Sequence, residues 1–277
     1  MFKNLATLFK YRSLLQTLVS RELKARYRGS FFGFLWSFFN PMLLMLVYSL
    51  VFSYILKQQN PETTPYSLYL FCGILPWTWF ASSVLEASNS LMINSGLIKK
   101  ILFPAEVLPL VNVFANLVHF LFGLPILLLF FIYYNYETPL TPFIAYQHPI
   151  TWYILLLPVV MLVQLIFTAG LGFLVASLSV HFRDLQSILG NLVTFWFFAT
   201  PIIYPLSMPG VKDSSFLKSL LHFNPMTHVM EGYQSCLFYG RLFDWRALGN
   251  TFLVSVALFF IGYYVFDKLR DTFPEEV

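Results

Sequence analysis

The residue types that usually do chemistry are few in this chain and do not gather into a catalytic or metal site. No Gly is followed by Lys, so the Gly-x-x-x-x-Gly-Lys-Ser/Thr loop that cradles the phosphates of ATP is missing. Ser, Asp and His occur without an arrangement that would identify a nucleophilic triad. The histidines are scattered rather than spaced as metal ligands: His119, His148, His181, His222 and His228. The sequence therefore predicts a chain that is not an enzyme and holds no metal or cofactor of its own.

Two carboxylates need a separate explanation because they lie in apolar stretches, where an unpaired charge is costly. Glu86 falls late in the second apolar segment, and Glu231 falls in a shorter apolar stretch further on. Either each pairs with a neighbour near the membrane surface, or Glu231 sits at a helix end and helps to fix an extracellular gate. Cys72 and Cys236 also lie in or beside apolar segments, which favours two buried thiols over a disulfide.

The composition indicates that lipid, rather than water, surrounds much of the surface of this chain. Hydrophobic residues make up 58% and charged residues 11%, with a mean hydropathy of +0.69. Soluble domains carry roughly 45–50% apolar and about 25% charged residues, so this chain lacks the charge to cover a soluble surface. At about 20 residues per span, 277 residues accommodate six helices in a single domain. The net charge of +4 is concentrated beside the first apolar segment, which favours contact with lipid headgroups over nucleic acid.

The apolar segments have the lengths of an all-α integral membrane protein with six spans. They cover 34–56, 67–90, 107–134, 152–179, 187–205 and 250–267. The second segment is aromatic early and polar late, so its polar side should face protein or water. The fourth contains small residues that allow close contact between helices: Gly170, Gly172, Ala176 and Ser177.

Two further stretches complete the predicted organisation. Residues 5–28 place apolar and basic residues on opposite sides of a helix, which predicts an amphipathic interfacial helix within a cytoplasmic segment 1–33. Spans one to five then occupy 34–205. The stretch 206–249 holds two apolar pieces too short to cross a bilayer, interrupted by Pro225. It predicts a re-entrant helical hairpin between spans five and six, with a pair of amphipathic surface helices as the alternative. The last span and tail are 250–277.

The distribution of basic residues predicts the orientation. The heaviest cluster of Lys and Arg lies beside the first span, within residues 3–28, and the 135–151 loop holds no Lys or Arg. This bias places both termini in the cytoplasm. On that side, residues 94–106 form a short amphipathic unit between spans two and three, bounded by Gly96 and Pro104. Such a unit suits a rigid cytoplasmic projection that a partner could push, but taken by itself the stretch is better explained as an ordinary loop with lipid-facing lysines.

Four sequence blocks, in a fixed order, resemble the ABC-2-type permeases that export polysaccharides and polyol phosphates. The blocks are LKARYRGSFFGFLWS at 23–37 with Asn40-Pro41; GLIKK at 96–100 with Phe103-Pro104 and Pro109; FRDL at 182–185 with TPIIYP at 200–205; and NPMT at 224–227 with Glu231. Together they cover essentially the whole chain. Four ordered blocks are a specific signal, whereas any one alone would be weak.

The resemblance implies a six-span subunit that works as a homodimer with two copies of a separate ABC ATPase, which would bind the ATP and Mg²⁺. It implies that a coupling helix lies near 95–106 and that a motif after span four also belongs to the cytoplasmic face. It also implies a cytoplasmic entrance, and a channel lined by spans one and five. The residues so implied are Lys99, Lys100, Phe103, Pro104, Arg183 and Asp184 for coupling; Arg26, Tyr27 and Arg28 for the entrance and lipid phosphate; Tyr48, Phe52, Trp196, Phe197 and Tyr204 for the channel; and Asn224, Pro225 and Glu231 for the hairpin.

The function implied is export of a lipid-linked polysaccharide, of the O-antigen, capsule or teichoic acid type, across the bacterial inner membrane. Arg and Lys suit the phosphate of a lipid anchor, and aromatic faces let sugar rings slide without tight directional bonds. One alternative keeps the family and changes the cargo to a drug or small lipid. Others are a membrane enzyme acting on polyprenyl phosphate, which would need a charged cluster at one membrane face, and a passive channel.

Overall fold

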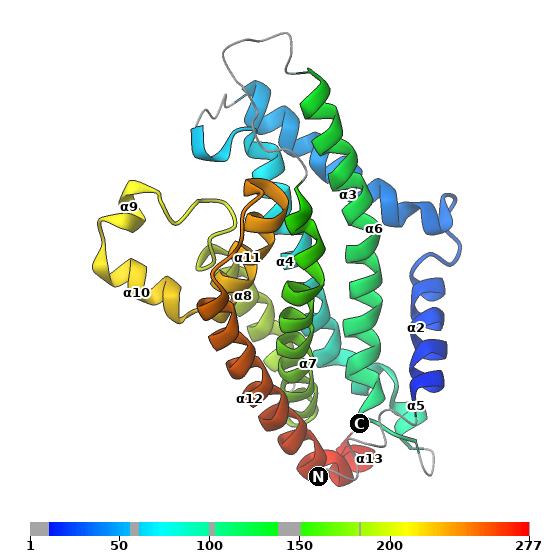
Figure 1. The fold of residues 1–277 in the computed structure, drawn as a ribbon. Coiled ribbons are helices and arrows are strands. Elements are labelled where there is room, and N and C mark those ends of the chain that lie inside the picture. The colour runs from blue at the N-terminus through cyan, green and yellow to red at the C-terminus, as the bar shows by residue number, and fades with distance from the viewer. Residues whose placement is uncertain (1–10, 56–60, 100–102, 138–150, 183, 277) are drawn as a thin grey trace.

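A computed structural model describes residues 11–55, 61–99, 103–137, 151–182 and 184–276 (Figure 1). Throughout these ranges every regular element is helical, as the sequence predicted. The predicted coupling residues Lys100 and Arg183 lie outside the described residues.

Four helices are long and apolar enough to cross a bilayer: α4 (Tyr66–Ile93), α6 (Val107–Glu137), α7 (Leu157–His181) and α12 (Trp245–Leu269). A 3₁₀ turn, Trp152–Leu156, precedes α7. At 1.5 Å per residue even a 25-residue helix exceeds the roughly 30 Å of the hydrocarbon core. Predicted spans two, three, four and six are therefore confirmed as continuous helices.

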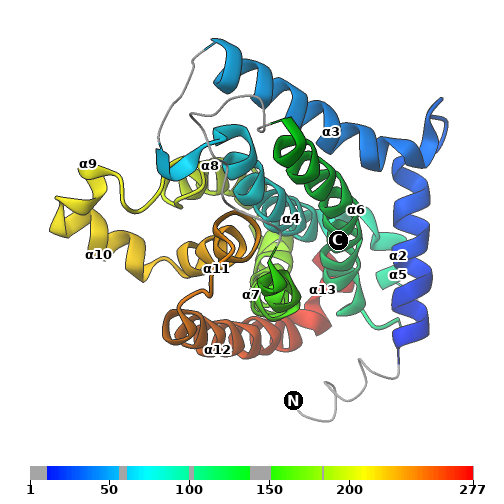
Figure 2. The same ribbon diagram turned by 45° about the horizontal axis from the view of Figure 1, so that its top comes forward.

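Helix α4 lies at the centre of the bundle, between α6, α7 and α11 (Figures 1 and 2). Side chains tie it to both long neighbours. The indole Nε1 of Trp79 donates to the carbonyl of Val113 on α6 at 3.2 Å, and Gln164 on α7 donates to the carbonyl of Pro76 at 2.8 Å. Both donors are buried, where an unpaired amide or indole N–H would be costly. These bonds fix the register of the three helices.

Helices α7 and α12 meet backbone to backbone. A Cβ added to Gly170 would lie 2.6 Å from the backbone of Phe259, and a Cβ added to Gly262 would overlap the carbonyl oxygen of Gly170. The predicted close contact of the fourth span is confirmed at Gly170. Its partner, Gly262, was not predicted.

Two apolar helices are shorter. Helix α3 (Trp36–Tyr48) contains Pro41 and continues as a π-helical segment, Ser49–Ile55, in place of predicted span one. Helix α8 (Leu185–Phe198) stands for predicted span five but ends seven residues before the predicted 205. Pro201 explains the early end, because a proline lacks the N–H that would continue the helix and disfavours helical geometry at the residue before it.

Side chains from other segments donate hydrogen bonds to the backbone carbonyls of the turn after α8. Asn224 donates to the carbonyl of Ala199 at 2.9 Å, Gln234 to that of Pro201 at 3.0 Å, and Tyr66 to that of Ile203 at 2.6 Å. The carbonyls at a helix end need such partners when they are buried. The turn is thus a fixed element of the fold.

Helix α2 (Arg12–Arg26) covers the described part of the predicted amphipathic segment. Its apolar side packs against the first turns of α6, where Leu18 is buried with Val107 and Val111. Figure 2 shows α2 beside α6 and at an angle to α3. The turn between α2 and α3 uses Gly29 and Gly33, both at positive φ.

The predicted hairpin region divides into an exposed and a buried part. Helices α9 (Pro209–Lys212) and α10 (Ser215–Phe223) project from the bundle (Figure 1), and Phe216 and Phe223 on α10 are exposed. Helix α11 (Pro225–Gln234) and the π-helical Ser235–Tyr239 pack inside, against α4, α7 and α12. The predicted break at Pro225 is confirmed.

Candidate functional site

Helices α2, α4 and α6 share a cluster of charged and polar side chains. Arg26 on α2 forms an ion pair with Glu86 on α4, and its other terminal nitrogen donates to Asn116 Oδ1 on α6 at 2.9 Å. Asn116 in turn donates to Glu86 Oε2 at 2.7 Å. Glu22 adds a second carboxylate 3.6 Å from Arg26 Nε. The predicted need of Glu86 for a partner is thereby confirmed.

The cluster continues toward α3. The hydroxyl of Tyr27 lies 3.2 Å from His119 Nδ1 on α6 and accepts a hydrogen bond from Ser37 on α3 at 2.9 Å. Arg26 and Tyr27, two of the predicted entrance residues, therefore form hydrogen bonds with other helices of the bundle. Arg28, the third, is exposed, as are Arg21 and Lys24 on the same helix.

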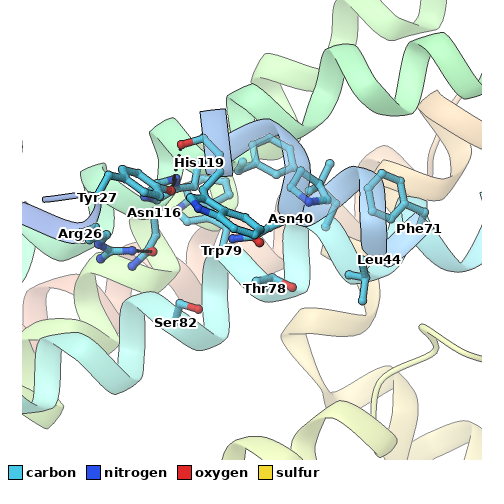
Figure 3. Close-up of a pocket in the computed structure, with 15 residues that line it drawn as sticks. Arg26, Tyr27, Asn40, Leu44, Phe71, Thr78, Trp79, Ser82, Asn116 and His119 are labelled. Atoms are coloured by element: carbon cyan, nitrogen blue, oxygen red, sulfur yellow. Dashed lines mark hydrogen bonds between the residues drawn. The ribbon is translucent and has the colours of Figure 1, made fainter. Parts of the chain in front are cut away.

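A pocket of about 370 Å³ lies beside this cluster, between the α2–α3 unit and the middle of α4 and α6 (Figure 3). Its walls combine indole and phenyl rings with amide, hydroxyl and imidazole groups. They include Arg26, Tyr27, Trp36, Ser37, Asn40, Phe71, Thr78, Trp79, Ser82, Asn116, His119 and Phe120. We call it the inner pocket.

The sequence held a signal for α6 that was not used. Asn112, Asn116 and His119 follow one another at spacings of four and three within an apolar span, which places them on one helix face. Polar residues on one face of a membrane helix point to protein or water. In the structure Asn112 donates to the backbone carbonyl of Glu86, so this face is the one that meets α4.

Helix α8 turns a polar and aromatic side outward. Ser187, Asn191, Thr194, Phe195 and Phe198 are exposed along one face, which we call the open face of α8. Phe195 is 71% and Phe198 58% exposed. Thr194 donates to the carbonyl of Gly190, but within the described parts of the chain no group hydrogen bonds the side chain of Asn191.

Two of the aromatic residues predicted for the channel lie on the side of α8 that packs against the bundle. Trp196 packs against Phe80 on α4 at 5.2 Å between ring centroids and donates from Nε1 to Asn224 at 2.8 Å. Phe197 packs against Trp77. Trp196 and Phe197 thus belong to the packed side of α8, opposite its open face.

Of the remaining predicted channel residues, Tyr48 and Tyr204 are half-buried. Tyr48 packs at the edge of the main core, and Tyr204 donates to the carbonyl of Phe198 at 2.9 Å. Phe52 lies in the π-helical segment after α3, and its side chain is outside the described part of the structure.

Asn224 links the end of α8 to the start of α11 through hydrogen bonds of its side chain. Its Oδ1 caps α11 by accepting from the N–H of Met226 at 3.0 Å and also accepts from Trp196, while its Nδ2 donates to the end of α8. Pro225 then opens α11 at a position that needs no N–H. Glu231 lies 3.5 Å from His228 Nδ1, so it has the neighbouring partner that one of the two predictions required.

The predicted coupling segment is anchored rather than loose over its described part. Helix α5 (Ser95–Ile98) buries Ile98 in a cluster with Phe266 and Phe273, the latter in the short helix α13 (Phe273–Glu276), and Phe103 packs against the same cluster. Lys99 is exposed beside them. The buried Glu106 lies 3.9 Å from Arg270. A partner that contacts Lys99 would therefore press on a packed end of the bundle.

The short segment between α7 and α8 lies at the same end of the molecule as α5 and α13 (Figure 1). Phe182 and Asp184 are exposed there, and His181 lies 3.3 Å from Thr272. Pro104, the other predicted coupling residue, is half-buried before α6. The described coupling residues thus gather at one end.

Comparison with known proteins shows to which family a chain with this arrangement of helices belongs. The family model described as ABC-2 type transporter matches residues 13–238, which is most of the chain. The chain belongs to the ABC-2 type transporter family. It is therefore a multi-pass membrane permease subunit rather than an enzyme, as the sequence predicted.

Members of this family with curated names resemble the chain over nearly their whole length. The O-antigen export system permease protein RfbA of Myxococcus xanthus is 42% identical over all 277 residues, 100% of both chains. A protein of the same name from Klebsiella pneumoniae is 30% identical over 98% of this chain and 96% of its own. The polysialic acid transport protein KpsM of Escherichia coli is 22% identical over 89% of this chain and 90% of its own.

Proposed function

We propose that this chain is the permease subunit of an ATP-driven ABC exporter that moves a lipid-linked polysaccharide from the cytoplasm across the bacterial inner membrane. Family membership and the names of its full-length relatives support the class of transporter and of cargo. The missing phosphate-binding loop supports a separate ATPase subunit that supplies ATP and Mg²⁺.

The observation that carries this proposal is the open face of α8. An amide such as that of Asn191 costs roughly 2–7 kcal/mol when it leaves water without a hydrogen-bond partner. Lipid therefore disfavours the polar stripe of this face, formed by Ser187, Asn191 and Thr194, and a water-filled path or a second copy of the chain suits it. Hydroxyl and amide groups beside Phe195 and Phe198 match a sugar chain, which has both hydroxyl groups and apolar ring faces.

The open face fits a homodimer in which two copies of α8 line one path, with α3 beside it. In this arrangement the short apolar helices α3 and α8 complete six spans, and α10–α11 forms the re-entrant hairpin on the outer side. The termini then lie in the cytoplasm with α5 and α13. The exposed Arg28, with Arg21 and Lys24, supplies the positive charge for a lipid phosphate at the entrance.

Coupling follows from the anchored cytoplasmic end. The ATPase binds at Lys99 and at the exposed turn containing Phe182 and Asp184. Because Ile98 is buried with Phe273, displacement of α5 moves the ends of α6 and α12 with it. The open faces of the two α8 helices separate as their bundles tilt, which opens the path.

Reconstitution tests the proposal directly. The permease and its ATPase subunit are placed in vesicles, and the movement of a labelled lipid-linked oligosaccharide is measured together with ATP turnover. We expect movement that needs ATP, and turnover that the glycan stimulates. Absence of transport, together with chemical turnover of the polyprenyl substrate by this chain alone, would overturn the exporter.

The same assay examines the open face. Asn191→Leu should lower export about tenfold, equivalent to about 1.4 kcal/mol in the barrier, because it replaces a polar wall by an apolar one. Asn250→Leu makes the same change at an exposed position of α12 and should leave export unchanged. Equal export by both variants at equal abundance would contradict a path along α8.

Reversing the charge of Lys99 and Lys100 together, as Lys99→Glu with Lys100→Glu, should weaken binding of the ATPase about tenfold. Membrane insertion should not change, because Lys99 is exposed and the packing of α5 rests on Ile98. Co-purification and the affinity of the two subunits are the measurements. Lys218→Glu, on the projecting helix α10, is the control; normal assembly and normal export by the Lys99/Lys100 variant would reject the assigned surface.

A further inference from the structure

The inner pocket is a cavity inside one subunit, separate from the open face of α8. It exists because α2 packs against α6 while α3 turns away from α2 at Gly29 and Gly33. Its volume of about 370 Å³ falls within the range of small-molecule sites, roughly 300–1,000 Å³. Figure 3 shows its polar side chains along the middle of α4 and α6.

Three of its polar groups have no partner in the described structure. No described residue hydrogen bonds the side chains of Asn40 on α3 or Ser82 on α4, and the buried Nε2 of His119 on α6 is also without a partner. They come from three different helices and line one pocket. The buried Nε2 of His119 requires a polar occupant, and the exposed amide of Asn40 and the half-buried hydroxyl of Ser82 offer that occupant further hydrogen-bonding groups.

The charges around the pocket show which kind of polar occupant fits. Arg26 is the only Lys or Arg among the described lining residues, and its guanidinium is engaged by Glu86, Glu22 and Asn116. Its positive charge is therefore neutralised, so the pocket offers no free cation to a phosphate. An uncharged ligand with several hydroxyl groups would use the free hydrogen-bonding groups without adding charge.

The apolar part of the wall fits the same ligand. The indoles of Trp36 and Trp79 line the pocket, and Trp79 is held in place by its bond to Val113 and by stacking on Phe120 at 5.3 Å. A rigid ring presents a flat apolar surface at low entropic cost. A sugar ring has apolar C–H faces and hydroxyl edges, and so matches both parts of the wall.

We propose that the inner pocket is a saccharide subsite, which binds one uncharged sugar unit of the glycan within each subunit before it reaches the path along α8. This inference rests on the proposed function, because a glycan exporter brings such a ligand to the pocket. The subsite hydrogen bonds the sugar hydroxyl groups through Asn40, Ser82 and His119. The lipid phosphate binds elsewhere, at the exposed basic residues of α2.

The test uses full-length permease in lipid nanodiscs and saturation-transfer NMR. The probes are the methyl glycosides of glucose, mannose, galactose, rhamnose and N-acetylglucosamine. We expect at least one to bind with millimolar affinity. Ser82→Leu, which fills the pocket, and Asn40→Ala, which removes an exposed amide, should each weaken binding about tenfold or more. Ser219→Leu, at an exposed position of α10, should not.

Each outcome decides the proposal. Absence of binding by all five glycosides, or equal binding by wild type and the Ser82→Leu variant at equal abundance and melting temperature, would overturn the subsite. Displacement of a bound glycoside by polyprenyl phosphate but not by a second glycoside would assign the pocket to the lipid anchor and reject the sugar. Vesicle export separates this result from the function, since export without glycoside binding rejects only the subsite.

Discussion

Replacing Gly262 by alanine should remove most of the folded permease from the membrane. The added Cβ would overlap the carbonyl oxygen of Gly170, so α7 and α12 would have to separate. The three nearest atoms that this Cβ would meet all belong to the backbone of α7, which cannot move aside as a flexible side chain can. Overpacking of this kind costs roughly 3 kcal/mol, a large share of the stability of an ordinary domain. Abundance in membranes and melting temperature in detergent measure the effect.

Helix α12 supplies its own control. Gly249 is exposed on the same helix, and a Cβ there would meet no atom within 4 Å. Gly249→Ala should therefore be neutral or slightly stabilising, because alanine favours a helix by up to about 1 kcal/mol. If the Gly262→Ala and Gly249→Ala variants melt at the same temperature, the close crossing of α7 and α12 is not required.

Breaking the ion pair between Arg26 and Glu86 should be the second most damaging change. Glu86→Leu leaves Arg26 without its main partner, and Arg26→Met leaves a carboxylate inside the bundle. Removing one member of a buried pair costs roughly 3–5 kcal/mol. Because the side chain of Glu86 is still 35% exposed, we expect about 2 kcal/mol for each single variant.

A double-mutant cycle isolates the pair. The Arg26→Met, Glu86→Leu double variant should be less destabilised than the sum of the two single changes, because neither charge is then left alone. Free energies of unfolding from denaturant titration give the coupling. Arg28→Met serves as the control, since Arg28 is exposed two residues away. Strictly additive single variants would show that the pair does not link α2 to α4.

The long helices could be predicted from sequence because the bilayer fixes their length. Predicted spans at 67–90, 107–134, 152–179 and 250–267 each match a helix to within a few residues at most ends. The end of α8 was misplaced because the apolar run continues through Pro201 to Pro205, and hydropathy was given more weight than the two prolines. The backbone rule for proline would have ended the helix correctly.

The candidate site was less predictable because its contacts join distant segments. Arg26 and Glu86 are 60 residues apart, and the sequence showed only that Glu86 needed a partner. The aromatic residues of α8 do not show which side of the helix faces outward, because four of them are consecutive, at 195–198, and so point in all directions. Ser187, Asn191 and Thr194, which recur at spacings of four and three, lie on one exposed polar stripe of the helix.

The ion pair also bears on how the chain is made. Arg26 lies 60 residues before Glu86, and Asn116 follows Glu86 by 30 residues. At a synthesis rate of 5–20 residues per second, Arg26 leaves the ribosome roughly 3–12 seconds before Glu86. The counter-ion therefore exists before the carboxylate enters the bilayer, and Asn116 arrives afterwards to complete the set. Arg26 is thus available as a counter-ion when α4 enters the bilayer, so Glu86 need not enter as an unpaired charge.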